Sequence, residues 1–332
     1  MNDHTADATL PVRTALDQLR QSIEAQIIGQ QHLVEALLIA LLADGHLLVE
    51  GAPGLAKTRA VRVLAQGIDA SFHRIQFTPD LLPADLTGTE IYRPQDGSFR
   101  FQQGPLFHNL VLADEINRAP AKVQSALLEA MAERQITVGM QTYSLPELFL
   151  VMATQNPLEQ EGTYPLPEAQ LDRFLMHVRI GYPTANAEQQ ILRLAREEAA
   201  ATIGSPPAKP ATRVAPQTVL QGRRDILQVF MSEKLEAYVL QLVLASRDAT
   251  RYSAQIARWL QYGASPRGTI ALDRCARARA WLHGRDFVSP DDIQAVAPDV
   301  LRHRLILSYE AEADGATSDR IIGELLSLVP VP

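Results

Sequence analysis

The sequence predicts an α/β protein in which a five-stranded parallel sheet with helices on both faces precedes a helical domain. Three observations support this prediction. Five short apolar segments alternate with helical patterns between residues 46 and 180, which is the pattern of a sheet covered on both faces. From residue 217 onward only helical periodicity is found. A chain of 332 residues also has room for two domains.

The first part of the chain is predicted to be helical up to the first strand. Residues 1–10 are polar and are expected to be disordered. Residues 12–43 have helical periodicity that breaks near residues 27–30, and the second half is apolar enough for a core helix. Strands are expected where short apolar runs stand between turn residues, at 46–50, 71–77, 109–114, 148–153 and 174–180.

Two small β-hairpins are predicted among these elements. Residues 91–101 alternate around a Gln95-Asp96-Gly97 turn and follow a short helix at 81–89. Residues 136–145 form a second hairpin candidate after a helix at 120–133. Each hairpin fits two roles, a moving lever on a substrate or an extension of a subunit interface, and the sequence does not decide between them.

The remaining chain is predicted to be helical. Residues 187–200 have a helical pattern, and residues 201–216 are rich in Ala, Pro and Gly, which is typical of a linker. Ser265 and Ser289 each stand before a proline, as N-caps do at the start of a helix. The only cysteine, Cys275, falls within a helical pattern and is expected to pack in a core.

Composition excludes several classes of protein. The net charge is −7 and the pI is about 5.7, which disfavours broad nucleic-acid binding. A single cysteine allows no disulfide within the chain, so we expect a reducing compartment, the cytoplasm. The longest apolar run, residues 37–42, is too short to insert into a membrane, and no signal segment is expected at the N-terminus. The histidines show no metal-ligand spacing.

The strongest functional signal is a glycine-containing loop between the first strand and a helix. Its residues are Gly51, Ala52, Pro53, Gly54, Leu55, Ala56, Lys57 and Thr58. In such a loop, backbone N–H groups and the helix N-terminus surround an anion. Lys57 would then reach the β- and γ-phosphates of a nucleotide, and the Thr58 hydroxyl would ligate Mg²⁺. A plain strand-to-helix turn with an exposed lysine is the simpler alternative.

Ala56 departs from the usual pattern of this loop, in which a glycine precedes the lysine. Alanine tolerates a positive φ poorly. We therefore expect Ala56 to lie in an ordinary region of backbone conformation.

Two further strands end in polar residues that complete a nucleotide-hydrolysis site. Asp114 and Glu115 follow a buried strand, whose carboxyl end opens at the ligand crevice of a parallel sheet. Asp114 would face the Mg²⁺ ion, and Glu115 would polarise the attacking water. Asn156 follows another strand, and its amide would contact this water or the γ-phosphate if that strand lay between the other two. An acidic turn and an Asn-Pro strand stop are the simpler alternatives.

Two arginines are candidates for stabilising the transferring phosphoryl group. Arg173 lies at a helix-to-strand junction, and Arg267 lies just inside the helix that begins after Ser265. For either arginine alone, a surface ion pair is the favoured explanation, and only the whole set of motifs overturns it.

Taken together, these motifs resemble the MoxR family of AAA+ ATPases. The resemblance extends from about residue 27 to about residue 303, and Ala before the lysine is usual in this family. The segments that carry it are residues 51–58, 76–83, 112–119, 153–157, 171–174 and 263–268.

The resemblance implies a role for each matching residue. Lys57 and Thr58 match the Walker A residues, and Asp114 and Glu115 match the Walker B pair. The segment with Ile28 and Gly29 resembles the part of the family fold near the adenine. The remaining matches are Asn156 to sensor 1, Arg173 to the arginine finger offered to a neighbouring subunit, Arg267 to sensor 2, and Arg118 to a second inter-subunit arginine.

The resemblance also implies the domain organisation. Residues 11–184 would form the AAA+ core, with a helix-2 insertion at about 78–103 and a hairpin before sensor 1 at about 136–145. Residues 185–216 would form a connecting helix and linker. Residues 217–332 would form an all-helical lid domain.

Such proteins form rings, usually hexamers, bind ATP and Mg²⁺, and act as chaperones with von Willebrand factor A-domain partners on client proteins. The client of this chain is unknown. Three alternatives stay open: an MCM-like motor on nucleic acid, which the acidic pI disfavours, an ATP-gated scaffold, which Glu115 disfavours, and a magnesium-chelatase-like subunit.

Overall fold

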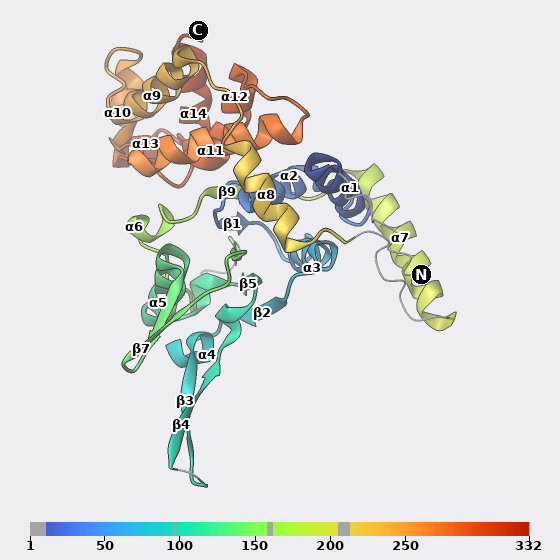
Figure 1. Ribbon diagram of the computed structural model, residues 1–332. Helices are drawn as coiled ribbons and strands as arrows, with labels where there is room; N and C mark the ends of the chain where they lie inside the picture. The colour runs from blue at the N-terminus through green and yellow to red at the C-terminus, as the bar shows by residue number, and fades with distance from the viewer. Residues whose placement is uncertain (1–10, 96, 158–161, 205–212, 332) are drawn as a thin grey trace.

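The computed structural model describes residues 11–95, 97–157, 162–204 and 213–331, so the segment predicted to be disordered lies outside the described residues. Its centre is a five-stranded parallel sheet with the strand order β2-β5-β8-β1-β9 (Figure 1). The strands are β1 (Leu47–Glu50), β2 (Phe72–Gln76), β5 (Leu110–Asp114), β8 (Leu150–Gln155) and β9 (Met176–Arg179). The predicted sheet is confirmed, and β8 lies between β1 and β5.

Helices cover both faces of this sheet. Leu47 and Val49 pack in one apolar core with α1, α2 and α3, whereas Leu48 packs in a second core with α5. Because both faces of the central strands are buried, β1, β5 and β8 are apolar at successive positions until their carboxyl ends, whereas the edge strand β2 is mostly exposed and carries polar residues. The four helices are α1 (Val12–Glu24), α2 (Gln31–Leu42), α3 (Lys57–Ile68) and α5 (Ala121–Glu133).

Both predicted hairpins are present. The first consists of β3 (Gly88–Arg93) and β4 (Ser98–Gln103), and it projects far from the sheet (Figure 1). The second consists of β6 (Gln135–Val138) and β7 (Gln141–Ser144). The rings of Phe101 and Tyr143 stack with their centroids 4.1 Å apart, so the two hairpins contact each other. Short helical segments near them are α4 (Pro83–Thr87), η1 (Pro105–Phe107), η2 (Ile116–Arg118) and α6 (Glu168–Leu171).

The C-terminal part is helical except for one short strand pair. Its helices are α8 (Pro216–Ile226), α9 (Glu233–Arg247), α10 (Ala254–Trp259), α11 (Pro266–Leu282), α12 (Pro290–Leu301), α13 (Tyr309–Ala313) and α14 (Ser318–Leu328). The expectation of helices alone was wrong, because β10 (Leu260–Tyr262) pairs with β11 (Ile306–Leu307) in antiparallel orientation. Strands of two and three residues are too short to show alternation in the sequence.

The predicted helix starts in this part are confirmed. The Ser265 side chain accepts a hydrogen bond from the backbone N–H of Arg267, and Ser289 forms a capping box with Asp292. Cys275 is free and buried, as expected of a core residue.

One continuous apolar core joins the C-terminal helices to the sheet. This core runs from β1 through α2 to α11. At Gly222 of α8, an added Cβ would come within 2.8 Å of the Leu42 side chain on α2, so the two helices are in close contact. The long helix α7 (Ala185–Gly204) extends past α3 on the other side (Figure 1). Within the described residues, no helix is both long and apolar enough to cross a membrane.

Candidate nucleotide-binding site

The loop between β1 and α3 has the geometry of an anion-binding loop. Gly54 has φ +82°, and no atom lies within 4 Å of the place where a Cβ would stand. Helix α3 begins at Lys57, whose Nζ donates a hydrogen bond of 2.7 Å to the carbonyl oxygen of Gly51. The lysine ammonium is therefore held across the loop, next to the positive end of the helix dipole. Thr58 follows it in the first turn of α3.

Ala56 has a positive φ, and the expectation of an ordinary conformation was wrong. Its φ is 59° and its ψ is 15°, in the left-handed region. The residue directly before α3 must turn the chain sharply into the helix, and this geometry overrides the preference of alanine. An L-residue in this region carries strain of about 1–2 kcal/mol.

Ala56→Gly is therefore expected to raise the free energy of unfolding by about 0.5–1 kcal/mol, as measured by urea denaturation. The gain is the strain removed less the extra freedom that glycine gives the unfolded chain. Ala65→Gly, within helix α3, is the matched control and should instead lower the free energy of unfolding by about 1 kcal/mol. A loss of the same size in both variants would contradict the strain at Ala56.

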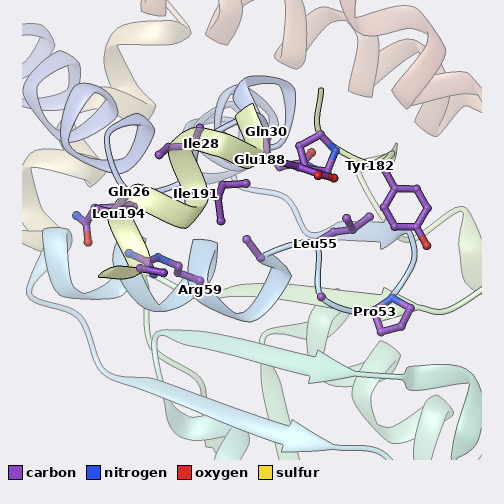
Figure 2. Close-up of a pocket in the computed structure, with 14 residues that line it drawn as sticks. Gln26, Ile28, Gln30, Pro53, Leu55, Arg59, Tyr182, Glu188, Ile191 and Leu194 are labelled. Atoms are coloured by element: carbon purple, nitrogen blue, oxygen red, sulfur yellow. The ribbon is translucent and has the colours of Figure 1, made fainter. Parts of the chain in front are cut away.

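A cavity of about 320 Å³ opens beside the loop (Figure 2). Its walls come from the turn after α1, the loop itself, the segment after β9 and helix α7. Predicted cofactor residues that line it are Ile28, Pro53, Gly54, Leu55 and Ala56, whereas Gly29, Gly51, Ala52, Lys57 and Thr58 do not. Ile191 and Leu194 of α7 add to an apolar lining that suits a flat heterocyclic base.

Close packing and two polar contacts fix the walls of this cavity. Gly29 has φ +78°, and an added Cβ would come within 2.9 Å of Ala187 at the start of α7. Gln30 donates a hydrogen bond of 3.0 Å to the carbonyl oxygen of Gly181. Farther along α7, Glu198 forms a two-pronged ion pair with Arg59 of α3. Helix α7 is thus held over the loop from both ends of the cavity.

The carboxylates lie at the same edge of the sheet as the loop. Asp114 ends β5, and Glu115 follows with φ +58°. Thr154 of the adjacent β8 donates a hydrogen bond of 2.6 Å to Oδ1 of Asp114 and accepts one of 2.9 Å from the Glu115 backbone N–H. The buried Asn156 follows β8. Because the strands are parallel, the structure brings all four predicted segments to one crevice.

Two residues of β2 that sequence analysis did not single out hold these carboxylates. Arg74 donates to Oδ2 of Asp114 from both Nε (3.0 Å) and Nη2 (2.6 Å). Gln76 donates a hydrogen bond of 2.8 Å to Oε2 of Glu115, and Arg118 lies 3.1 Å from the same oxygen. Arg74 and Gln76 are two residues apart and so lie on one face of an edge strand. Two weak signals in the sequence pointed to them, this spacing and the position of Gln76 at the start of the matching segment 76–83.

The donor set near the loop fits Mg²⁺. Among the described residues, no group of three or more His, Cys, Asp and Glu side chains gathers to hold a metal ion. One hydroxyl, Thr58, and one carboxylate, Asp114, stand at the crevice instead. Mg²⁺ is commonly bound by one or two protein ligands together with nucleotide phosphates and water.

Glu50, the residue before the loop, connects this edge of the sheet to the C-terminal helices. The imidazole of His177, 3.0 Å away, and the guanidinium of Arg179, at 3.3 Å, lower the pKa of Glu50 to about 2 although burial opposes this shift. Arg179 also pairs with Asp319 of α14 at 3.0 Å. The base of the loop is therefore joined to α14 by ion pairs.

Arg173 and Arg267 do not approach the loop of their own chain. Both are exposed and line a second cavity, of about 440 Å³, together with Gly45 and His46. Those two residues precede β1, so this cavity lies at the amino edge of the sheet. A strand of four residues spans about 13 Å, which separates the arginines from the loop at the opposite edge.

Asp172 holds Arg267 in place, and Arg173 is held separately. Its Oδ2 lies 3.4 Å from Arg267 Nη1 and accepts a hydrogen bond of 2.9 Å from the Ser265 hydroxyl. Its Oδ1 accepts one of 2.9 Å from the buried Arg304. Arg173 donates to the carbonyl oxygen of Leu128 at 2.8 Å. Two residues far apart in the sequence are thus presented side by side on one surface.

Two family models match the chain. Residues 46–176 match the family described as "ATPase family associated with various cellular activities (AAA)". Residues 253–325 match the family described as "AAA lid domain". The first match contains the loop and both carboxylates, and the second contains Arg267.

Known proteins are similar to the chain over nearly its whole length. Chaperone MoxR1 of Mycobacterium tuberculosis is 45% identical over 92% of this chain and 79% of its own. Protein MoxR of Methylorubrum extorquens is 33% identical over 96% of each chain. A crystal structure of a candidate ATPase from Cytophaga hutchinsonii has a TM-score of 0.88 at 46% identity, covering 97% of this chain and 96% of its own.

Proposed function

This chain belongs to the MoxR family of AAA+ ATPases, and on that premise we propose that it hydrolyses ATP in a ring of identical subunits to remodel a partner protein. One observation carries the proposal. The phosphate loop and the carboxylates lie at one edge of the sheet, and two exposed arginines lie at the other. A complete site would then need two subunits.

Within one subunit, the chain's residues would bind and orient the nucleotide. The backbone of residues 51–58 and the Lys57 ammonium would hold the phosphates, and the apolar cavity with Ile28 would take the adenine. Mg²⁺, held through Thr58 and Asp114, would neutralise charge on the phosphate oxygens. Glu115 would accept a proton from the attacking water, and Asn156 would orient this water or the γ-phosphate.

Between subunits, Arg173 would reach the γ-phosphate bound by the neighbour, with Arg267 beside it. Because donor and acceptor surfaces differ, this interface is heterologous, and such contacts close into rings when the rotation permits. We propose a hexamer, as is usual in the family. Arg118 is the alternative trans-acting arginine that the family resemblance suggests, although it contacts Glu115 of its own chain.

The biological role of ATP hydrolysis by this chain is inferred from its relatives. MoxR1 of Mycobacterium tuberculosis is named a chaperone, and we propose a chaperone-like action of this chain on a protein complex, with a von Willebrand factor A-domain protein as partner. The single buried cysteine is compatible with the reducing cytoplasm.

ATP turnover per chain, measured across a wide range of protein concentration, tests the proposal. We expect the specific rate to rise with concentration, because assembly completes each site, and Lys57→Ala to abolish it at every concentration. A rate per chain that is independent of concentration in a monomeric protein would contradict the shared site. ATP binding without hydrolysis at any concentration would instead indicate a switch or a missing partner.

A further inference from the structure

Both oxygens of the Asp114 carboxylate are occupied by side chains of the same chain. Thr154 holds Oδ1 at 2.6 Å, and two nitrogen atoms of Arg74 converge on Oδ2 at 3.0 Å and 2.6 Å. The Asp114 side chain is only 12% exposed, whereas that of Arg74 is 46% exposed. The Asp114 carboxylate is therefore held in place, whereas the Arg74 guanidinium has room to move toward solvent.

We propose that Arg74 is an internal counter-ion of Asp114 that competes with Mg²⁺ for this carboxylate and thereby sets how much Mg²⁺ the protein needs to bind nucleotide. The inference rests on the proposed function, which makes Asp114 a residue facing the metal. It assigns to Arg74 a positioning role, because the guanidinium acts through Asp114.

The physical argument concerns the cost of a lone buried charge. An ionised carboxylate with little access to water is destabilised unless a cation or hydrogen-bond donors compensate it. Arg74 supplies this compensation without metal, and a divalent cation supplies it when present. Because the Arg74 side chain is nearly half exposed, its ion pair is worth little, and a divalent ion held also by phosphates outcompetes it. Arg74 therefore lowers the apparent Mg²⁺ affinity without preventing binding.

Arg74 is also connected to the catalytic candidate Glu115. Its Nη2 donates a hydrogen bond of 2.8 Å to Oε1 of Gln76, and the amide nitrogen of Gln76 donates to Glu115. If Arg74 moved away from Asp114, Gln76 would lose its hydrogen bond from Arg74 while still donating to Glu115. The contact between Arg74 and the metal-facing carboxylate is thus connected through Gln76 to the proposed base.

The test is a Mg²⁺ titration of fluorescent ADP binding to metal-stripped full-length protein, with Mn²⁺ binding followed by electron paramagnetic resonance as a second readout. We expect Arg74→Ala to lower the half-saturating Mg²⁺ concentration by about 3- to 10-fold, because the competitor is removed. Arg74→Lys keeps a positive charge but lacks the guanidinium fork that reaches Oδ2 with two nitrogen atoms. Its half-saturating Mg²⁺ concentration should lie between those of the wild type and Arg74→Ala.

Arg62→Ala is the matched control, since it removes an exposed arginine of α3 and should leave the titration unchanged. If Arg74→Ala fails to fold, as judged by circular dichroism, Arg74→Lys and Arg74→Gln carry the test. An unchanged or increased Mg²⁺ requirement in a folded Arg74 variant would overturn the inference. Wild-type nucleotide binding that ignores Mg²⁺ would instead refute the metal site of the proposed function.

Discussion

Replacing Glu115 with Gln is expected to slow ATP hydrolysis by about 10²- to 10⁴-fold, the range attributed to a positioned general base. The amide has nearly the same shape as the carboxylate but cannot accept the proton of the attacking water. Gln76 and Arg118 contact only Oε2 of Glu115, so the side chain should keep its place in the variant. ATP should still bind, because the loop and Asp114 are untouched.

The measurement is single-turnover hydrolysis of radiolabelled ATP, together with equilibrium binding of a fluorescent analogue. Glu129→Gln is the matched control, because it neutralises an exposed carboxylate on α5 and should turn over ATP at the wild-type rate. Wild-type hydrolysis by Glu115→Gln would show that another group is the base.

Arg173→Ala is expected to lower hydrolysis by about 10³-fold, at the lower end of the range for arginine fingers. The nucleotide affinity of each chain should change little, because Arg173 lies at the amino edge of the sheet, away from its own loop. A steady-state assay paired with a binding titration measures both effects. Arg251→Ala, which removes an exposed arginine of the C-terminal part, is the control.

Mixing experiments separate action in trans from action in cis. Chains with Arg173→Ala keep an intact loop, and chains with Lys57→Ala keep an intact arginine. Where the two kinds alternate, some interfaces combine both intact parts, so the mixture should hydrolyse ATP although neither variant does so alone. Absence of rescue in mixed assemblies would contradict the action of Arg173 in trans and would leave Arg118 as the candidate trans-acting arginine.

The sheet and the residues at its carboxyl edge were predictable because they depend on local signals. Buried parallel strands are short apolar runs, and the residues that follow them are polar. Once the order of β1, β8 and β5 is known, Lys57, Asn156 and Asp114 must meet at one crevice. The resemblance to the family, which the comparisons confirm, rests on these same segments.

What the sequence did not reveal depends on tertiary structure. The local conformational preference of alanine does not predict a positive φ. Ala56 adopts one because the loop must turn into α3. Arg74 and Gln76 face the carboxylates only because β2 pairs with β5. Arg173 and Arg267 line one cavity, and Arg267 is held there by Asp172, over a separation in sequence that no local pattern spans.

The loop and the two arginines lie at opposite ends of the strands of one sheet. Each subunit therefore has two different faces, one with the loop and one with the arginines. In an open row of subunits, the chain at one end would have arginines that face no loop. The chain at the other end would have a loop that faces no arginines. If the site is shared as proposed, a pair of subunits completes only one site, and every added subunit completes one more. Closure of the proposed ring would bring the last loop and the last pair of arginines together, so the closed assembly would be the only one in which every bound nucleotide faces an arginine.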